Sequence, residues 1–247
     1  DCFQLAHEAD RELPDLRFHF LTKANGGSAS ARNAALKTVA EGWVLFLDAD
    51  DELACDPLPM LPETQVISAV LCSVVYMRNG RQKSRLIPAC PDPEALPELF
   101  SRGNPYTVSS VVFRRECLSS LFDEKLVFLE DWHFWAMNSD IFLKATRRSE
   151  EVLCRINLGG GSKSADHEMN GRYRHEVADR LRQHYADAGV KVQNNLKLQQ
   201  SIALLQAGKR LKSSLFPSFP VSFVLLVKWL VYALFFSWYQ RVHPYRR

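Results

Sequence analysis

The sequence lacks the cysteine patterns that mark disulfide frameworks and zinc sites. Its 247 residues include six cysteines, none of which forms Cys-x-x-Cys or stands at zinc-like spacing from a histidine. Disulfide frameworks are typical of much shorter secreted chains, so we expect reduced thiols in a cytosolic domain. The six are Cys2, Cys55, Cys72, Cys90, Cys117 and Cys154.

An excess of charge of one sign is also absent. The formal net charge is +3, and no long basic run is present that would indicate a nucleic-acid partner. The composition is otherwise that of an ordinary globular protein, with 47% hydrophobic and 24% charged residues. A chain of this size can bury one sizeable core.

The most informative stretch is an apolar run that ends in carboxylates. Trp43 to Leu47 is apolar, and Asp48, Asp50 and Asp51 follow. Such a run predicts a strand buried on both faces of a sheet, and ligands of open α/β sheets bind beyond the strands' carboxyl ends. Residues i and i+2 of an extended chain point to one side, so Asp48 and Asp50 can share a site with Mg²⁺ or Mn²⁺ and substrate phosphates. Taken alone, Asp-x-Asp fits a solvated acidic turn better.

The residues before this strand favour the metal and phosphate site. The loop that begins at Asn25 leads into a predicted helix, Ala29 to Ala40, with Ser28 as its N-cap and Gly42 beyond its end. Free backbone N–H groups at a helix N-terminus attract anions. Arg32, in the first turn, can add a bidentate phosphate contact. The residues themselves therefore predict a metal and phosphate site on an α/β sheet.

At this point the sequence resembles the inverting family-two glycosyltransferases of GT-A fold. The central signature of that family is similar to Asn25-Gly26-Gly27-Ser28, Ala31-Arg32-Asn33-Ala34-Ala35 and the stretch from Gly42 to Asp51. Its acceptor-side Glu-Asp motif is similar to Phe122-Asp123-Glu124 followed by Leu129-Glu130-Asp131-Trp132. The matching region extends from about Asn25 to Ser164. The resemblance implies a Rossmann-like mixed sheet flanked by helices.

The resemblance also implies which residues serve the acceptor. Asp131 would be the general base that takes the proton from the acceptor hydroxyl, and Glu130 would orient the acceptor or the surroundings of Asp131. Without the resemblance, these two residues are acidic groups in the first turn of a helix from Glu130 to about Ser139, where the helix dipole stabilises them.

On the donor side, the resemblance implies a nucleoside diphosphate sugar and a divalent metal, Mg²⁺ or Mn²⁺. Asp50 would bind the metal, and Asp48 would lie against the ribose or in the metal shell. The glycines of the loop from Gly159 to Ser164 could let it close over the diphosphate, although a passive linker is an alternative. The remaining expected substrate contacts are Asn25, Gly27, Arg32, Arg155 and Lys163.

Periodicity and turn residues predict the other elements. An Asn79-Gly80 dipeptide predicts a two-residue hairpin turn. The expected strands are Leu16 to Leu21, Gln65 to Met77, Arg81 to Ile87, Thr107 to Phe113, Ile141 to Ala145 and Val152 to Ile156. The expected helices are Cys2 to Leu13, Pro93 to Ser101, His167 to Gly189 and Val192 to Lys212.

Near its end the chain contains a long apolar stretch, Val221 to Tyr239, with Lys228 near its centre. Its length is about that needed to cross ~30 Å of hydrocarbon, although the lysine leaves an interfacial helix as an alternative to a span, and a buried soluble helix is a further alternative. We therefore expect a membrane-associating tail, a membrane partner and a location at the cytoplasmic face of a membrane, the bacterial inner membrane.

These expectations divide the chain into a partial GT-A glycosyltransferase domain over residues 1–165, a helical extension over 166–214 and a hydrophobic tail over 215–247. No nucleoside-holding motif of Asp-Gly-Ser type precedes the matching region, so we expect an N-terminally truncated sequence that lacks the first strands of the fold. The expected reaction is sugar transfer to a hydroxyl acceptor with inversion, in the synthesis of a membrane-associated glycan or lipopolysaccharide. A sugar nucleotidyltransferase and an inactive membrane-bound scaffold are alternatives.

Overall fold

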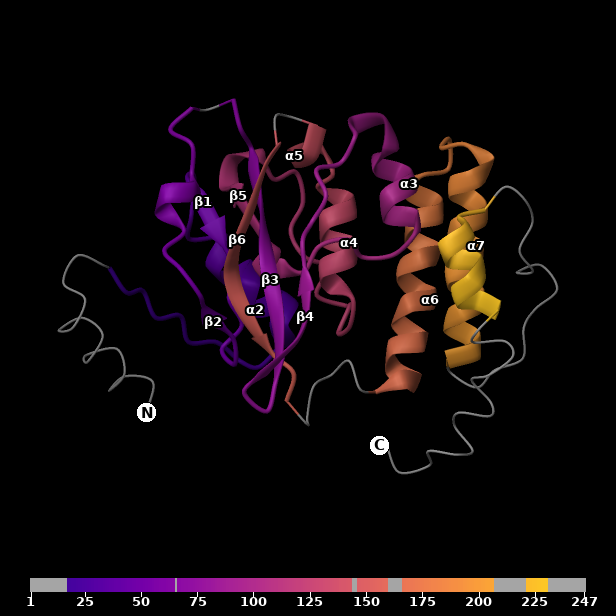
Figure 1. Ribbon diagram of the computed structural model, residues 1–247, viewed down its shortest axis with the longest axis horizontal. Helices are drawn as coiled ribbons and strands as arrows, with labels where there is room; N and C mark the ends of the chain where they lie inside the picture. The colour runs from indigo at the N-terminus through magenta and orange to yellow at the C-terminus, as the bar shows by residue number, and fades with distance from the viewer. Residues whose placement is uncertain (1–16, 65, 144–145, 160–165, 207–220, 231–247) are drawn as a thin grey trace.

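The computed structural model describes residues 17–64, 66–143, 146–159, 166–206 and 221–230, in which a mixed sheet is covered by helices (Figure 1). The strand order is β1-β5-β3-β6-β2, and β4 pairs with β3 beside this path. The strands are β1 (Trp43–Leu45), β2 (Glu52–Leu53), β3 (Ala69–Arg78), β4 (Arg81–Leu86), β5 (Val111–Arg114) and β6 (Thr146–Asn157). The α-helices are α2 (Gly27–Leu36), α3 (Leu96–Ser101), α4 (Glu130–Met137), α5 (Asp140–Leu143), α6 (His167–His184) and α7 (Val190–Gln206). The 3₁₀ turns are η1 (Leu58–Met60), η2 (Pro93–Ala95), η3 (Val108–Ser110) and η4 (Arg115–Cys117).

The strand that precedes the acidic triplet is shorter and more exposed than the sequence predicted. β1 has only half-buried residues, and its one pairing is antiparallel to β5. Leu47, expected inside the strand, lies beyond its end and is 42% exposed. The prediction of a strand buried on both faces is wrong because, in the described part of the chain, β1 lies at the edge of the sheet.

The buried strand is β3 instead. Its first seven residues are at most 5% exposed, and it pairs with β4, β5 and β6. Only the pairing with β6 is parallel. Asn79 and Gly80 have φ angles of 52° and 70°, as a type I′ turn requires, so the predicted hairpin between β3 and β4 is confirmed.

Four further predicted strands differ from the structure. Ile141 to Ala145 was predicted as a strand, but its first residues form the short helix α5, because a short apolar run carries no period that separates helix from strand. Val152 to Ile156 is part of the longer β6, and Thr107 to Phe113 begins with η3 before it becomes β5. Residues 17–26 have no regular secondary structure, so the strand expected from Leu16 is not formed there. The helix expected over Cys2 to Leu13 lies outside the described residues.

Helix α2 begins and ends earlier than expected. Its N-cap is Gly26, which makes no side-chain cap, and it ends at Leu36 rather than at Ala40. Ser28, the predicted N-cap, lies inside the helix, and its hydroxyl donates to Glu130 across the site. The helix N-terminus is therefore tied to α4 by a side-chain contact between residues far apart in the sequence.

Helices α4, α6 and α7 follow one another away from the sheet (Figure 1). One hydrophobic cluster joins this helical layer to the sheet and to α2. The tyrosine hydroxyl of Tyr185, just after α6, donates to the backbone oxygen of Ala136 in α4 over 3.4 Å. The cluster members from α6, from the turn after it and from α7 are Tyr173, Val177, Ala178, Leu181, Tyr185, Val192 and Leu196.

The described part of the C-terminal apolar stretch is a short helix over residues 223–230. Leu225 is buried against Leu198 and Ile202 of α7, whereas Phe223 and Val224 are 76% and 75% exposed. Among the helices in the described ranges, none has the length and apolar character needed to cross a membrane. The rest of the stretch, and the basic residues that flank it, lie outside the described residues.

Candidate active site

A cavity of about 320 Å³ opens where the acidic triplet, the ends of β3 and β6 and the start of α4 meet. One part of its wall is acidic and another is apolar. Its lining comprises Arg32, Asp48, Asp50, Asp51, Tyr76, Thr107, Val108, Ser109, Val127, Phe128, Leu129, Glu130, Asp131, Ile156, Asn157, Leu158 and Asn170. The structure thus brings both predicted carboxylate motifs, which are far apart in the sequence, into one cavity.

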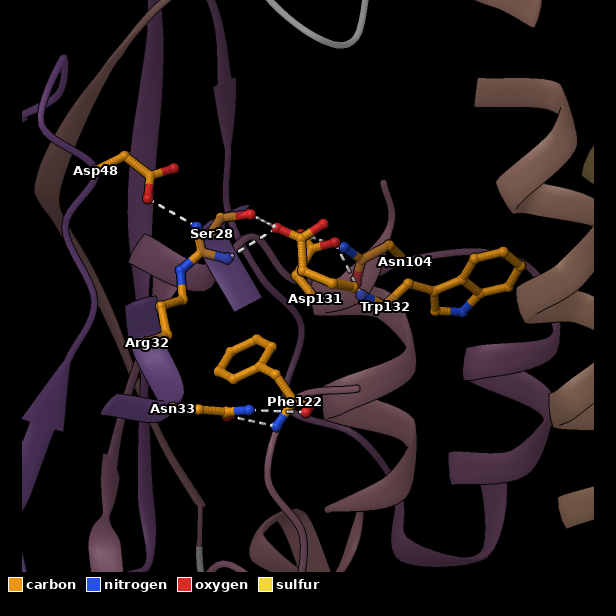
Figure 2. A network of polar contacts seen from close by, with 9 residues as sticks. Ser28, Arg32, Asn33, Asp48, Asn104, Phe122, Asp131 and Trp132 are labelled. Carbon is orange, nitrogen blue, oxygen red and sulfur yellow. Dashed lines mark hydrogen bonds and ion pairs between the residues drawn. The ribbon is translucent and has the colours of Figure 1, made fainter. Parts of the chain in front are cut away.

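Arg32 connects the two motifs (Figure 2). Its guanidinium donates to Asp48 Oδ1 over 2.7 Å and to Glu130 Oε1 over 2.9 Å. The Ser28 hydroxyl donates to the same Glu130 oxygen over 2.6 Å. Burial disfavours the charged arginine, but the carboxylates of Asp48 and Glu130 outweigh it and raise the pKa of Arg32. In this structure the predicted diphosphate contact is therefore an arginine already bound by two carboxylates.

Two stacked aromatic rings, those of Phe122 and Phe134, support Arg32. The guanidinium lies 5.5 Å from the centroid of the Phe122 ring, which stacks on Phe134 of α4 at 3.8 Å. Asn33, one residue further along α2, exchanges two hydrogen bonds of 2.9 Å with the backbone of Phe122 (Figure 2). The buried amide of Asn33 fixes the distance between α2 and the Phe122 backbone. The position of Arg32 against the Phe122 ring is thereby fixed as well.

Asp131 is held by two donors. Asn104 Nδ2 donates to Asp131 Oδ2 over 2.8 Å, and the backbone N–H of Trp132 donates to Oδ1 over 2.9 Å. The Tyr106 backbone N–H donates to Asn104 Oδ1, which turns the amide nitrogen of Asn104 toward Asp131. Burial and then the charge of Glu130 raise the pKa of Asp131 to about 7, although both donors favour the ionised form.

Leu129 sets the direction in which α4 starts. It is the N-cap residue of α4 and has φ 57° and ψ 24°, in the left-handed region that residues other than glycine rarely adopt. This conformation is one that surrounding contacts must maintain, and such strain is common at functional sites. It places Glu130 and Asp131 in the first turn of α4 with both side chains in the cavity wall.

The acidic triplet is anchored to β6 by Asn157. Its side-chain amide donates to the backbone oxygen of Asp50 over 2.6 Å, and its backbone N–H donates to Asp51 Oδ1 over 2.9 Å. Burial raises the pKa of Asp51, and the charges of Asp50 and Asp48 add to this effect. Asp51, which the sequence left without a role, is thus partly a structural carboxylate.

The donor set fits a metal ion only in part. Among the described residues no group of three or more histidine, cysteine or carboxylate side chains is arranged to hold a metal. Asp48 is paired with Arg32 and Asp51 with Asn157, whereas the Asp50 carboxylate makes no hydrogen bond or ion pair within the described ranges. Mg²⁺ is commonly bound by one or two carboxylates together with substrate phosphates, and Asp50 with Asp48 fits that pattern.

Three predicted substrate contacts that the structure describes, Asn25, Gly27 and Arg155, do not line the cavity. Asn25 accepts a hydrogen bond from the Gly27 backbone N–H over 3.1 Å, so these two residues shape the turn before α2. Arg155 of β6 lies opposite Glu52 on the neighbouring strand β2, 3.7 Å from the Glu52 carboxylate. Lys163 lies outside the described residues.

The sequence reasoning missed the residues that hold the predicted carboxylates in place. Asn104, Asn33 and Asn157 each bind a part of the site through a side-chain amide. Asn33 lies within the stretch that is similar to the family's central signature, so the sequence pointed to its position. Nothing in a single sequence points to Asn104 or Asn157. Each bonds across a separation of tens of residues, which no local pattern reveals.

Comparisons with known proteins bear on the family and the fold of this chain. Residues 4–122 match the family model described as glycosyl transferase family 2. The chain is similar to the crystal structure of TarS from S. aureus, with a TM-score of 0.50 and 17% sequence identity over 93% of this chain. It spans 39% of the length of that TarS chain. No curated protein sequence matches the chain significantly. The family resemblance is thereby confirmed, and the mixed sheet with flanking helices is consistent with the GT-A fold.

Proposed function

We propose that this relative of the family-two glycosyltransferases transfers a sugar from a nucleoside diphosphate sugar to a hydroxyl acceptor, with inversion. The observation that carries the proposal is the position of Asp131. Its carboxyl group shares one cavity with Asp48 and Asp50, and its pKa is raised to about 7. A base with a pKa near the working pH combines a useful ionised fraction with the strength to remove a hydroxyl proton.

The acidic triplet is the proposed donor side. A divalent cation, Mg²⁺ or Mn²⁺, would be held by Asp50 and, in part, by Asp48, and would neutralise charge on the leaving diphosphate. Asp48 is exposed enough to exchange its Arg32 partner for a metal, because its side chain is 48% exposed. Arg32 would then be free on that side to meet a phosphate oxygen while it still binds Glu130.

Membrane contact at the C-terminal end is part of the same proposal. The helix over residues 223–230 presents Phe223, Val224, Val227 and Leu230 to solvent, at 41% exposure or more. An apolar helix face of this kind favours an interfacial position on a lipid surface. The proposed acceptor is accordingly a lipid-linked glycan or lipopolysaccharide, and the proposed location is the cytoplasmic face of a membrane, the bacterial inner membrane.

The first experiment is calorimetric titration of the chain with UDP, in Mn²⁺ and in EDTA. We expect metal-dependent binding that weakens at least tenfold in Asp50→Ala, because that carboxylate is the unpaired one. Asp187→Ala is the matched control, since Asp187 is exposed beyond α6 and is not among the residues that line the cavity. Failure of the folded wild-type chain to bind UDP or another nucleoside diphosphate would overturn the donor site.

The second experiment measures turnover with the nucleoside diphosphate sugar that binds. Asp131→Asn keeps the shape of the side chain and removes the base, so we expect a fall of about a hundredfold or more. Full turnover in Asp131→Asn would refute the role of this carboxylate, whatever the donor.

A further inference from the structure

Two polar atoms in the cavity wall are buried and lack hydrogen-bond partners among the described residues. They are the carboxamide oxygen of Asn170 and the hydroxyl oxygen of Thr107. Most buried polar atoms in folded proteins are hydrogen-bonded, and one that is not costs stability. Both residues line the same cavity as Asp131. Unsatisfied groups that share a cavity wall are suited to meet a ligand.

Asn170 is held rigidly on α6. Tyr173, three residues further along and therefore on the same helix face, stacks on Phe128 with the ring centroids 5.6 Å apart and the planes at 19°. Arg180 on α6 also forms an ion pair with Asp123, which lies in the loop before α4. These contacts fix α6 against the segment that leads into α4. Asn170 therefore presents its side chain to the cavity from an anchored helix turn.

Thr107 approaches the cavity from another direction. It is the N-cap residue of η3, but its side chain makes no capping hydrogen bond. Its backbone oxygen accepts from the backbone N–H and the hydroxyl of Ser110, which holds the residue in place. Asn104, three residues earlier, binds Asp131. The unpartnered Thr107 hydroxyl thus belongs to the segment that positions the proposed base.

Apolar side chains complete this part of the wall. Val108, Phe128, Leu129 and Leu158 line the cavity together with the two unpartnered polar atoms. A wall with apolar patches and a few fixed hydrogen-bonding atoms matches a sugar ring, which has apolar C–H faces and hydroxyls at its rim. A nucleoside diphosphate would instead need cations or backbone N–H groups at this place.

We propose that Asn170 and Thr107 form a hydroxyl-binding subsite that selects the sugar ring next to Asp131. This assignment rests on the proposed function, because it presupposes a sugar substrate in the cavity. It makes α6, which lies outside the region that matches the family model, a part of the specificity determinant. A site built to bond a hydroxyl discriminates against a substrate that lacks it, since its own buried groups then stay unpaired.

The test uses variants that remove the polar atoms without changing the shape of the side chains. Asn170→Leu and Thr107→Val are near-isosteric, and Thr107→Ser restores the hydroxyl. If the polar atoms have no structural partner, these variants keep or raise the thermal unfolding midpoint. Asn138→Leu is the matched control: Asn138 is fully buried and its side chain makes hydrogen bonds to Ser119, Ser120 and Phe134, so that variant should lose stability. A fall in the midpoint of Asn170→Leu comparable with that of Asn138→Leu would overturn the assignment.

Binding is measured by saturation-transfer NMR with the full chain and the methyl glycosides of glucose, galactose, mannose and N-acetylglucosamine. We expect one of them to bind the wild type, and Asn170→Leu and Thr107→Val each to weaken it about fivefold, the loss of one neutral hydrogen bond. Removing from the glycoside the hydroxyl that binds one of these side chains should weaken binding to the wild type. The same monodeoxy glycoside and the complete glycoside should bind equally well to the variant that lacks this side chain's polar atom. A merely structural role of the side chain would not produce that equality.

Two binding results would also count against the subsite. Equal binding of the glycoside by the wild type and by both variants would show that the sugar is held elsewhere, and would leave the proposed transfer reaction standing. No binding of any of the four glycosides by the wild type would overturn the subsite itself, whereas the UDP titration in the preceding section decides the transfer reaction independently.

Discussion

The contact between Arg32 and Glu130 gives the sharpest test of the site, because it can be tested without a substrate. The two side chains are 11% and 12% exposed and 2.9 Å apart, whereas Asp48, the other partner of Arg32, is 48% exposed. Removing one member of a buried ion pair commonly costs 3–5 kcal/mol, because the other charge stays buried without a partner. An exposed pair contributes about 0–1 kcal/mol.

Replacing Arg32 with methionine should therefore cost about 2–4 kcal/mol of unfolding free energy. The cost lies below the full value for a buried pair because Glu130 keeps the hydrogen bond from Ser28. Asp48→Asn should cost less than about 1 kcal/mol. In the double variant Arg32→Met/Glu130→Gln the uncompensated charge is gone, so we expect at least about 1.5 kcal/mol to be recovered relative to the sum of the single changes.

The assay is urea unfolding followed by tryptophan fluorescence, for which Trp132 and Trp135 of α4 are fully buried reporters. The slope of free energy against urea must stay unchanged across the variants for the comparison to hold. The reasoning is refuted if Arg32→Met costs less than 1 kcal/mol, or if its cost and that of Glu130→Gln simply add in the double variant.

Two further predictions concern Asp131 and Leu129. With the pKa of Asp131 at about 7, turnover should fall about tenfold per pH unit below 7, and Asn104→Ala should move this limb to higher pH because the amide of Asn104 favours the ionised carboxylate. An acid limb unchanged in Asn104→Ala would contradict the hydrogen bond. Because the pKa of Asp131 in the folded chain lies above the ordinary aspartate value of 3.8, ionisation of Asp131 opposes folding. Stability should therefore decline as pH rises from about 4 to 7, and Asp131→Asn should remove that part of the decline. Leu129→Ile keeps the side-chain volume but places a β-branched residue at φ 57°, so it should cost about 1–2 kcal/mol of unfolding free energy and lower turnover. The control Leu118→Ile, at φ −75°, should cost less. Equal costs in urea unfolding would mean that the left-handed conformation carries no strain.

The sequence predicted those parts of the fold that depend on neighbours along the chain. The hairpin at Asn79 and Gly80 follows from turn chemistry, and the helix that begins at Glu130 follows from its acidic first turn and apolar interior. Whether a strand lies at the edge or in the centre of a sheet depends on partners that are far away in the sequence. β1 was therefore predicted as a buried strand although it has a neighbour on one side only within the described ranges, and α5 was predicted as a strand from an ambiguous apolar run.

The candidate site shows the same division. Asp48, Asp50, Glu130 and Asp131 could be chosen from motifs, and they do line one cavity. Their electrostatic arrangement could not, because Arg32 joins carboxylates 16 and 98 positions away. The donor to Asp131 likewise comes from Asn104, which belongs to no motif in the sequence.

The helices after the matched region help to stabilise the candidate site. The division of the chain at residue 165 stays a prediction, but α6 and α7 place side chains in the same hydrophobic cluster as α2, β5 and α4. Each such side chain that is fully buried stabilises the fold by roughly 1.5–3 kcal/mol, and a domain has only about 5–15 kcal/mol in total. The stability that keeps Leu129 in its left-handed conformation therefore depends partly on α6 and α7. Because α6 also brings Asn170 to the cavity, the same helix both supports the site and forms part of its wall.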